Sequence, residues 1–518
     1  MNIPFILEKA LSLYAEKEAV VCSKKRFTYR QFADRTFRLA HFLKAMGIDK
    51  GDCVAILHQN SHQFIEAYFA VAQLGAILNP LNIRLSPGEL SFILKDSGAV
   101  LLIASRRYGE QVAEIKEMET GLRQIIWTGQ GEIPAISSSV DYEDMLKRAS
   151  DNPIPVPPIS DGDIAHLYYT SGTTGRPKGV ILSHKNVCTH ALAAIAELRL
   201  CDRDNWIHAA PLFHLADAWA TFAITWVGGK HVIVEDFEPS LVLSILQEEG
   251  ITITNMIPTM LNMLVNTPGV DSYNFSSLRA ILSGGASIAS EVVKKIMETF
   301  KCDYIQTYGM TETSPYLTLS ILKENLIHLS PEEQFQYKAR TGRPFMGVLL
   351  KVVREDGSEV SSNDEEVGEI IVKGDIVTEG YLNRPEETAM SLKGGWLYTG
   401  DMATLDKEGY VNIVDRKKDV IITGGENVYS VEIENALYMH PSVLEGAAIG
   451  VPDPKWGEAV KAVVVLKPGH QATEEEIIQH CKKQIARYKA PKSVDFVLEL
   501  PKTGSGKIYK KGLKMRYR

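Results

Sequence analysis

Cysteine is scarce in this chain of 518 residues, and its scarcity excludes folds that depend on cross-links. The six cysteines lie far apart in the sequence, with no C-x-x-C pair among them. A disulfide scaffold and a structural zinc site both need closely patterned cysteines, so we expect neither. A reducing compartment is the default for such a chain, and we therefore predict a cytoplasmic location.

Long apolar runs are missing as well. No stretch approaches the ~20 consecutive apolar residues that a membrane-spanning helix needs. The N-terminal segment from Met1 to Lys17 interleaves charged and apolar side chains and lacks the regions of a secretory signal. The final residues, Arg516-Tyr517-Arg518, match no ER or peroxisome address. We expect neither export nor a transmembrane segment.

The chain also lacks the excess of positive charge that is typical of nucleic-acid-binding proteins, since its net charge is −8. The charge is unevenly distributed. Residues 416–518 carry 18 Lys and Arg against 12 Asp and Glu, which leaves 38 against 52 for residues 1–415. A basic C-terminal unit beside an acidic body suits a partner or substrate that carries phosphates, although an uneven solvated surface is the simpler explanation.

The composition is that of a large globular protein, with 45% hydrophobic and 23% charged residues. At roughly 150 residues per domain, the length favours about three units. Helical spacing from Phe32 to Met46 alternates with short apolar runs such as Val54–Leu57 and Val100–Ile103. This alternation predicts an α/β fold with largely parallel sheets.

The pattern changes after Gly347. Short β segments at Leu349–Val353, Gly368–Lys373 and Gly409–Val414 are separated by turns, which predicts a barrel-like or antiparallel subdomain. A charged stretch then begins at Arg416 and leads into a compact run of about a hundred residues. Near its end, Thr473 to Tyr488 has acidic residues at its start and basic residues at its end, as a helix dipole favours.

The sharpest local signal is the segment Thr170-Ser171-Gly172-Thr173-Thr174-Gly175-Arg176-Pro177-Lys178-Gly179. Glycines allow backbone amides to approach an anion, hydroxyls donate hydrogen bonds to it, and basic residues supply charge. The P-loop spacing is not met, because Pro177 precedes Lys178 and Gly179 follows it. Since both flanks are predicted strands, we expect the loop to join two strands and to bind a polyphosphate, the alternative being a plain hairpin loop.

The loop resembles the phosphate-binding loop of the adenylate-forming superfamily, which contains acyl-CoA synthetases, adenylation domains of peptide synthetases and luciferases. Further motifs of this family follow in order along nearly the whole chain. The resemblance implies an α/β fold with a large N-terminal domain of two layered α/β sheets plus a β-barrel-like subdomain, and a small mobile α+β C-terminal domain. We place these domains at residues 1–415 and 416–518, with a hinge near Lys418.

The family motifs imply a set of nucleotide-binding residues. Tyr308 resembles the tyrosine that stacks on adenine, Glu312 and Thr170 the magnesium partners, and Asp401 the acceptor of the ribose hydroxyls. Glu312 could instead cap a helix start. The predicted nucleotide-binding residues also comprise Ser171, Gly172, Thr173, Thr174, Gly175, Lys178, Gly284, Gly285, Ala286, Gly309, Met310, Thr311 and Arg416.

The remaining motifs concern the carboxylate, the C-terminal unit and coenzyme A. His214 resembles the family's histidine near the carboxylate pocket, although a histidine beside apolar residues is often simply a satisfied core residue. Lys507 resembles the lysine that bridges the carboxylate and the α-phosphate. Gly424 and Gly425 match the loop that enters for the second half-reaction. Trp456 could flank the coenzyme A entrance or belong to the domain core.

The resemblance therefore implies an ATP-dependent carboxylic acid–CoA ligase that uses Mg²⁺ and forms acyl-AMP. The alternative hypotheses for its function are a stand-alone adenylation domain, a luciferase-like oxygenase and a non-catalytic relative that binds nucleotide or acyl-CoA. The chain stops 11 residues after Lys507, with no carrier domain following, and keeps the family's lysine, glutamate and glycines. We expect small-molecule partners and no nucleic acid, and we leave a homodimer open.

We expect the acid to lie among small and apolar residues. The candidate lining is His208–Ala210, Ala216–Trp219, Met256, Gly284–Ala286 and Thr307–Tyr316, with Trp219, Trp226 and Tyr316 as the bulky members. None of these is Arg or Lys, so no cation is available for a second carboxylate. We therefore expect a monocarboxylic acid, either fatty or arylalkanoic.

Overall fold

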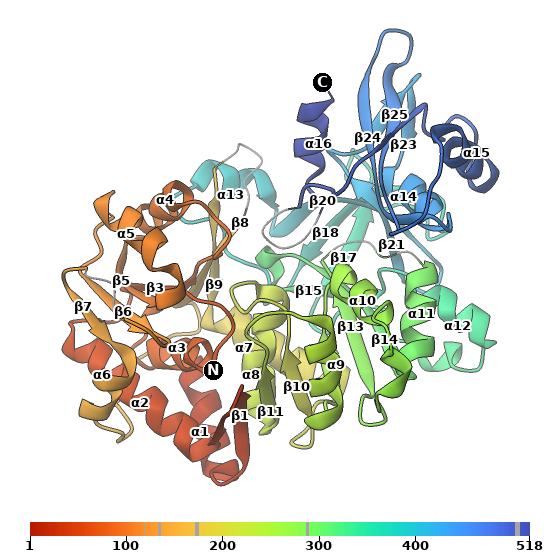
Figure 1. Cartoon of the computed structure of the whole chain (residues 1–518). Helices are drawn as coiled ribbons and strands as arrows, with labels where there is room; N and C mark the ends of the chain where they lie inside the picture. Colours follow the sequence, from red (N-terminus) through yellow and green to blue (C-terminus); the bar gives the residue numbers. More distant parts are fainter. Residues whose placement is uncertain are drawn as a thin grey trace.

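The computed structural model describes residues 1–118, 120–132, 136–170, 176–285, 288, 290–502 and 508–517. Two large sheets form the body, and two smaller sheets follow them in the chain, one antiparallel and one antiparallel except for a single parallel strand pair (Figure 1). This is the mixed α/β architecture that the sequence predicts. Among the described residues, no helix is both long enough and apolar enough to cross a lipid bilayer.

The first large sheet has seven strands in the order β7-β6-β5-β3-β4-β8-β9. Neighbouring strands are parallel except β8 and β9, which form an antiparallel hairpin. The strands are β3 (Cys53–Leu57), β4 (Ile77–Pro80), β5 (Ala99–Ser105), β6 (Gln124–Thr128), β7 (Ser139–Asp141), β8 (Ile164–Thr170) and β9 (Lys178–Ser183).

The second large sheet has nine strands in the order β16-β15-β14-β13-β12-β10-β11-β1-β2. Its central strands are parallel. At one edge β2 is antiparallel to β1, and at the other β15 is antiparallel to both β14 and β16. The strands are β1 (Glu18–Cys22), β2 (Lys25–Thr28), β10 (Asn205–His208), β11 (Lys230–Ile233), β12 (Ile253–Asn255), β13 (Ala280–Gly284), β14 (Asp303–Gly309), β15 (Tyr316–Leu319) and β16 (Arg343–Pro344).

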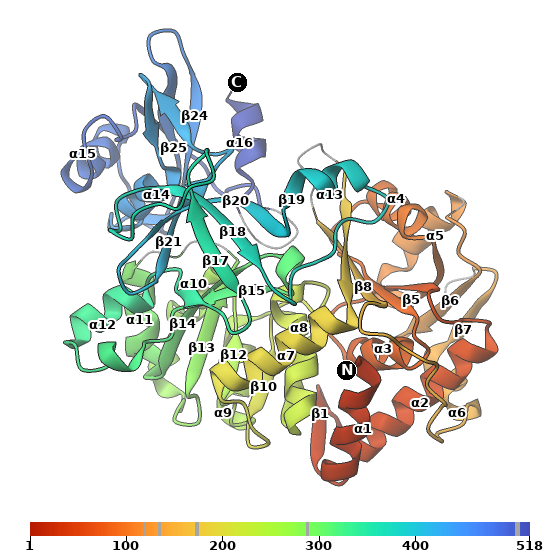
Figure 2. The ribbon, with the colours of Figure 1, turned by 180° about the vertical axis from the view of Figure 1, so that it is seen from behind.

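Helices α3 (His62–Gln73), α7 (His184–Leu198) and α8 (Leu215–Val227) lie between the two large sheets (Figure 2). Every residue of α3 is buried, as expected for a helix covered on all sides. These helices share one apolar cluster with α1 (Ile3–Tyr14) and α2 (Tyr29–Ala45). The helix predicted from Phe32 to Met46 is thus present as α2, whose first turn is closed by a capping box at Thr28.

The outer faces of the sheets are covered by separate helix groups. Helices α4 (Pro87–Ser97) and α5 (Gly109–Glu117) pack on the seven-stranded sheet. Helices α9 (Pro239–Glu248), α10 (Pro258–Val265) and α11 (Ser290–Phe300) pack on the nine-stranded sheet. Three shorter helices lie at the periphery: α6 (Tyr142–Arg148), α12 (Pro331–Lys338) and α13 (Pro385–Ser391).

A five-stranded antiparallel sheet forms the predicted β subdomain. Its strands are β17 (Leu349–Val353), β18 (Gly368–Lys373), β19 (Leu392–Lys393), β20 (Trp396–Leu405) and β21 (Val411–Arg416). The first two have the predicted bounds. Strand β21 pairs with β20 so that Arg416 lies opposite Asp401.

The last unit is a small sheet with three helices. Its strands are β22 (Ile421–Thr423), β23 (Glu426–Val428), β24 (Val443–Asp453), β25 (Gly457–Leu466) and β26 (Ser493–Phe496), and its helices are α14 (Ser430–Tyr438), α15 (Glu474–Gln484) and α16 (Lys510–Arg516). Thr473 and Glu476 form a capping box at the start of α15, which accounts for the predicted helix start. The unit projects from the top of the body in Figure 1.

Candidate active site

The β8–β9 hairpin holds the two ends of the glycine-rich loop. Thr170 pairs with Lys178 at the loop end of the hairpin, as the two predicted strands require. The loop residues Ser171, Gly172, Thr173, Thr174 and Gly175 lie outside the described residues. Lys178 is largely buried: its ammonium lies 3.9 Å from the centre of the Tyr381 ring and 3.7 Å from a Glu387 carboxylate oxygen.

Glu312 is tied to this hairpin through the segment 378–382. The Glu312 carbonyl accepts a hydrogen bond from Thr378 N at 2.8 Å, and the Tyr381 hydroxyl donates to Glu312 Oε1 at 2.9 Å. Leu382 N in turn donates to Gly179 O at 2.8 Å. The phosphate-loop hairpin and the predicted metal carboxylate are therefore held together, with Lys178 over the ring of Tyr381 and Glu312 at its hydroxyl.

Burial and the nearby Glu312 carboxylate raise the pKa of Tyr381 above its usual value, so the phenol keeps its proton at neutral pH. Sequence reasoning did not identify Tyr381. It lies far from Glu312 in the chain, and no periodicity or local spacing marks it. The local sequence there is a Gly380-Tyr381 pair after β18, which is typical of an ordinary turn and does not indicate a contact with Glu312.

Tyr308, Asp401 and Arg416 form a second group, carried by β14, β20 and β21. The Tyr308 hydroxyl donates to Asp401 Oδ2 at 2.7 Å, and Arg416 Nε lies 2.7 Å from Asp401 Oδ1. Burial and the Asp401 carboxylate raise the pKa of Tyr308 well above its usual value. Burial lowers the pKa of Arg416, but Asp401, Tyr308 and other nearby acidic groups together outweigh this effect, and the net shift is upward. Three residues predicted from separate motifs thus converge.

The strand ends around Tyr308 are packed at backbone distance. Gly284 pairs with Thr307, and a Cβ added to Gly284 would lie 2.1 Å from Thr307 Oγ1. A Cβ on Gly309 would lie 1.8 Å from Pro315 O. Only glycine fits at either position, so Gly284 and Gly309 set the spacing of these strands. Gly285 follows β13, while Ala286 lies outside the described residues.

The segment from Met310 to Thr313 turns away from β14 as a short 3₁₀ helix over Thr311–Thr313. Met310 N donates to Pro315 O at 3.0 Å, and Thr313 Oγ1 donates to Met310 O at 3.0 Å. This turn buries Glu312, which is 6% exposed. Glu312 lies inside a short 3₁₀ helix whose N-cap is Met310, and its carboxylate is held by Tyr381 from another segment.

His214 is the residue that directly precedes α8, and its ring centre lies 4.7 Å from that of Phe213. The loop before it is held by Asn60, whose side chain donates to His208 O and Ala210 O and accepts from Leu212 N at 2.7 Å. Asn60 is a positioning residue that sequence reasoning missed. A single asparagine after a strand is typical of a turn, and nothing in the sequence connects Asn60 with residues 208–212.

Part of the predicted acid pocket is aromatic. The Trp219 and Tyr316 rings meet at 5.1 Å, and His190 adds a third ring at 5.4 Å from Trp219 and 5.3 Å from Tyr316. The structure places Trp226 elsewhere: it lies about two helical turns beyond Trp219 and packs against Phe5 with ring centres 6.3 Å apart.

His208 also differs from a simple lining residue. It is fully buried, with Nδ1 at 2.8 Å from Asp217 Oδ2 and Nε2 at 2.9 Å from His231 Nδ1. Both ring nitrogens are occupied by these partners, so the side chain supports the end of β10.

The predicted C-terminal elements are only partly within the described residues. Gly424 and Gly425 form the turn between β22 and β23, and Gly424 N donates to Trp456 O at 2.8 Å. The Trp456 side chain is 45% exposed, so it is not a core residue of this unit. Lys507 lies outside the described residues; Lys502 and Ile508, on either side of its segment, pair with each other.

Among the described residues, no group of three His, Cys, Asp or Glu could hold a metal ion by itself. A buried carboxylate is nevertheless a ligand that Mg²⁺ uses when phosphates and water complete its shell. Glu312 is such a carboxylate, and Thr170, at the end of β8, carries a hydroxyl that could complete the donor set.

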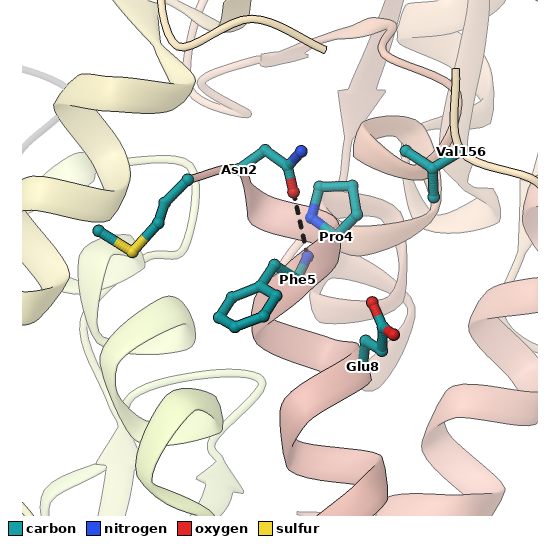
Figure 3. Close-up of a pocket in the computed structure, with 6 residues that line it drawn as sticks. Asn2, Pro4, Phe5, Glu8 and Val156 are labelled. Carbon is teal, nitrogen blue, oxygen red and sulfur yellow. Dashed lines mark hydrogen bonds between the residues drawn. The ribbon is translucent and has the colours of Figure 1, made fainter. Parts of the chain in front are cut away.

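A further hollow lies beside the N-terminal helix (Figure 3). Its lining comprises Met1, Asn2, Pro4, Phe5, Glu8 and Val156, and the Asn2 side chain accepts a hydrogen bond from Phe5 N at 3.2 Å. None of the predicted site residues lines it, so this hollow is separate from the candidate site.

Comparison with known proteins identifies the family. The AMP-binding enzyme model matches residues 7–382, and the AMP-binding enzyme C-terminal domain model matches residues 432–507. A feruloyl-CoA synthase from Amycolatopsis sp. is 38% identical over 95% of this chain and 94% of that protein. A long-chain-fatty-acid–CoA ligase from Thermus thermophilus is 35% identical over 100% of this chain and 96% of that protein.

Solved structures agree over the whole chain. The anthranilate CoA ligase AuaEII in complex with anthranoyl-AMP has a TM-score of 0.91 at 27% identity, covering 100% of this chain and 97% of its own. MatB from Rhodopseudomonas palustris, 28% identical with 100% and 99% coverage, has a TM-score of 0.87 with ATP bound and 0.77 as the apo protein. The chain belongs to the AMP-binding enzyme family and, within the adenylate-forming superfamily, to the acyl-CoA synthetase branch. The family prediction is confirmed.

Proposed function

We propose that this enzyme, an ATP-dependent acid–CoA ligase, activates a fatty or arylalkanoic monocarboxylic acid at the site between the β8–β9 hairpin and the Tyr308–Asp401–Arg416 group. The carboxylate attacks the α-phosphorus of ATP, and pyrophosphate leaves. The thiol of coenzyme A then attacks the acyl carbonyl of the acyl-AMP and releases AMP. The observation that carries the proposal is the joining of Lys178, Tyr381 and Glu312 in one constellation beside the hairpin.

The chain's own residues supply position and charge for the first step. Lys178 and the hairpin amides bind the β- and γ-phosphates, and Asp401 accepts hydrogen bonds from the ribose hydroxyls. Tyr308 packs against adenine, with its hydroxyl oriented by Asp401 at 2.7 Å. Preorganised groups of this kind act without reorganising during the reaction, and removing one donor typically costs about 10²–10³ in rate.

A magnesium ion is implied by the family, and when bound it neutralises phosphate charge. Glu312 is suited to hold it because one carboxylate oxygen is engaged by Tyr381 at 2.9 Å, which orients the group. Thr170, at the end of β8, supplies a hydroxyl at the mouth of the phosphate loop.

The C-terminal unit serves both steps in turn. We propose that residues 416–518 rotate about Lys418, so that Lys507 enters for adenylation and Gly424-Gly425 enter for thioester formation. Trp456, exposed beside Gly424, is placed to flank the pantetheine arm of coenzyme A. The net positive charge of this unit suits the phosphates of both substrates.

The acid class follows from the lining of the pocket. Trp219 and Tyr316 form an aromatic wall, and the described residues of segments 208–219 and 307–316 include no Arg or Lys. An apolar acid with a single carboxylate suits this surface. The names of the two curated relatives, a feruloyl-CoA synthase and a long-chain-fatty-acid–CoA ligase, cover both the aromatic and the fatty alternative.

The deciding experiment mixes the protein with ATP, Mg²⁺, coenzyme A and a panel of fatty and arylalkanoic acids, and measures AMP and pyrophosphate release. Release that requires both one acid and coenzyme A supports the proposal. Acid-dependent pyrophosphate exchange without any coenzyme A-dependent AMP release would instead indicate a stand-alone adenylation enzyme. The absence of both activities with every acid would leave a non-catalytic binding protein.

Two finer expectations accompany this function. We propose a cytoplasmic location, supported by the six unpaired cysteines, and a homodimer. Light scattering of the purified protein measures the second directly, and a monomeric mass would contradict it.

A further inference from the structure

The apolar cores of the chain are divided at the hinge. The clusters that fill and cover the two large sheets draw on residues up to Ile413, whereas the clusters of the last unit begin at Ile421. Among the described residues, no apolar cluster contains members from both sides of the segment 414–420. Apolar burial therefore does little to fix the orientation of the C-terminal unit on the body.

Among the residues that the structure describes, Asp415 makes a hydrogen bond across this division. Asp415 Oδ2 accepts a hydrogen bond from Ser430 N at 2.6 Å, while Oδ1 accepts from Arg416 N at 2.7 Å. Asp415 belongs to the body, because it pairs with Met402 in the β20–β21 ladder. Ser430 belongs to the C-terminal unit, because it is the first residue of α14.

Asp415 thus caps a helix of the other unit. The residue that precedes α14, Tyr429, makes no side-chain cap hydrogen bond. The first amides of a helix lack partners within the helix, and a carboxylate at that end also interacts favourably with the helix dipole. Asp415 is 2% exposed, so its charge is shielded from water in this arrangement.

A buried cation strengthens the same contact. Lys510 Nζ donates to Ser430 Oγ at 2.6 Å and lies 2.8 Å from Glu434 Oε1. Burial lowers the pKa of Lys510, but Glu434 and Asp415 outweigh it, so the ammonium stays charged. Lys510 follows Lys507 by three residues in the sequence, so this polar cluster lies close along the chain to the predicted adenylation lysine.

We propose that Asp415 is a positioning residue for the adenylation step: its carboxylate holds α14, and with it the C-terminal unit, in the orientation that this structure shows. This inference rests on the proposed ligase function and its rotation about Lys418. The two ends of the contact lie on opposite sides of Lys418, so rotation separates Asp415 from Ser430. The whole chain resembles ATP-bound MatB more closely than apo MatB, with TM-scores of 0.87 and 0.77, and we take this orientation as the adenylating one.

The expected effect of losing the cap is a change in the balance of the two half-reactions. Removing an N-terminal helix cap shifts an equilibrium by roughly fivefold. Asp415→Ala should therefore lower the rate of acid-dependent pyrophosphate exchange roughly fivefold. Thioester formation from supplied acyl-AMP and coenzyme A should be unchanged or faster. Without the cap, the adenylating orientation is less stable and competes less with the orientation that forms the thioester.

Ser430→Pro tests the same contact from the other side. Proline is favoured at the first helical position, and Tyr429 has the extended backbone (φ −89°, ψ 122°) that a following proline requires. This variant removes the amide that donates to Asp415 and should reproduce the Asp415→Ala ratio. Ser430→Ala keeps the amide and removes only the hydroxyl contact with Lys510, so it serves as the matched control.

The rescue and coupling experiments complete the test. Asp415→Asn keeps an acceptor that also caps helices well and should restore most of the exchange rate. Asp415→Ala combined with Ser430→Pro should be no worse than either alone. Asp356→Ala, which removes the acceptor of the Ser358 amide in an exposed turn of the β subdomain, should leave both half-reactions unchanged.

The outcomes separate the two proposals. An unchanged ratio of half-reactions in Asp415→Ala and Ser430→Pro, or an equal loss in both steps, overturns the role of Asp415. A wild-type protein that shows no acid-dependent exchange with any acid refutes the proposed function itself, before any variant is compared.

Discussion

Gly309→Ala is the substitution for which the geometry gives the most definite expectation. Gly309 ends β14, directly between Tyr308 and Met310. The added Cβ would lie 1.8 Å from Pro315 O and 2.7 Å from Pro315 C, although real Cβ contacts essentially never fall below 3.0 Å. Because both clashing atoms belong to the backbone, no side-chain rotation can relieve the overlap.

The strands β14 and β15 must therefore separate by about 1 Å at this point. Overpacking of this kind costs about 1–3 kcal/mol of unfolding free energy. A misplacement of about 1 Å in a positioning element can reduce a rate by about 10²-fold. Tyr308 lies on one side of the substitution and the turn that carries Glu312 on the other, so both the nucleotide and the metal contacts would shift.

The assay is acid-dependent pyrophosphate–ATP exchange together with thermal unfolding. We expect the exchange rate of Gly309→Ala to fall about a hundredfold. Gly88→Ala is the matched control, because no atom lies within 4 Å of its added Cβ and its φ is not positive. Wild-type exchange and an unchanged melting temperature in Gly309→Ala would refute the claim that Gly309 sets the strand spacing.

Three further substitutions test other parts of the site and the fold. Lys507→Ala should abolish acyl-AMP formation but spare thioester formation from supplied acyl-AMP; an equal loss in both steps, measured by product release, would contradict this division. Asp401→Asn should raise the KM for ATP about tenfold or more, because a charged hydrogen bond contributes about 1.5–3 kcal/mol; steady-state kinetics with kcat reported separately would show it. Burial raises the pKa of Glu66, but Arg35 and His62 together outweigh it and hold the pKa at about 2, below the ordinary 4.5. The charged form therefore stabilises the fold above pH 4.5, and this stabilisation is lost as the pH falls from 4.5 towards 2. Denaturant titrations across that range should show a weaker pH dependence for Glu66→Gln, and an unchanged dependence would count against the pairing.

Much of the fold was predictable because its signals are local. The apolar runs at Val54–Leu57 and Val100–Ile103 lie inside β3 and β5, since a strand buried on both faces needs a continuous apolar segment. The hairpin that carries the phosphate loop was predictable from its two flanking strands. The ends of α15 were readable because its cap and its charged turns lie within the helix itself.

The contacts between distant segments were not predictable from the residues alone. Tyr381 reaches Glu312 only because segment 378–382 pairs with β9, and no single segment contains that information. Asn60 holds the loop before His214 from a different sheet layer. The prediction that Trp226 lines the acid pocket was wrong for a different reason. Trp226 lies on the same helix as Trp219, but side chains two turns apart on one helix can contact different neighbours.

The separation of the apolar clusters on either side of segment 414–420 bears on how the protein responds to heat. With little shared burial, the two units need not melt together, and one unfolding free energy does not describe the whole chain. A nucleotide that contacts both units would couple their melting. The merging of two calorimetric peaks into one would then report how firmly a given ligand bridges them.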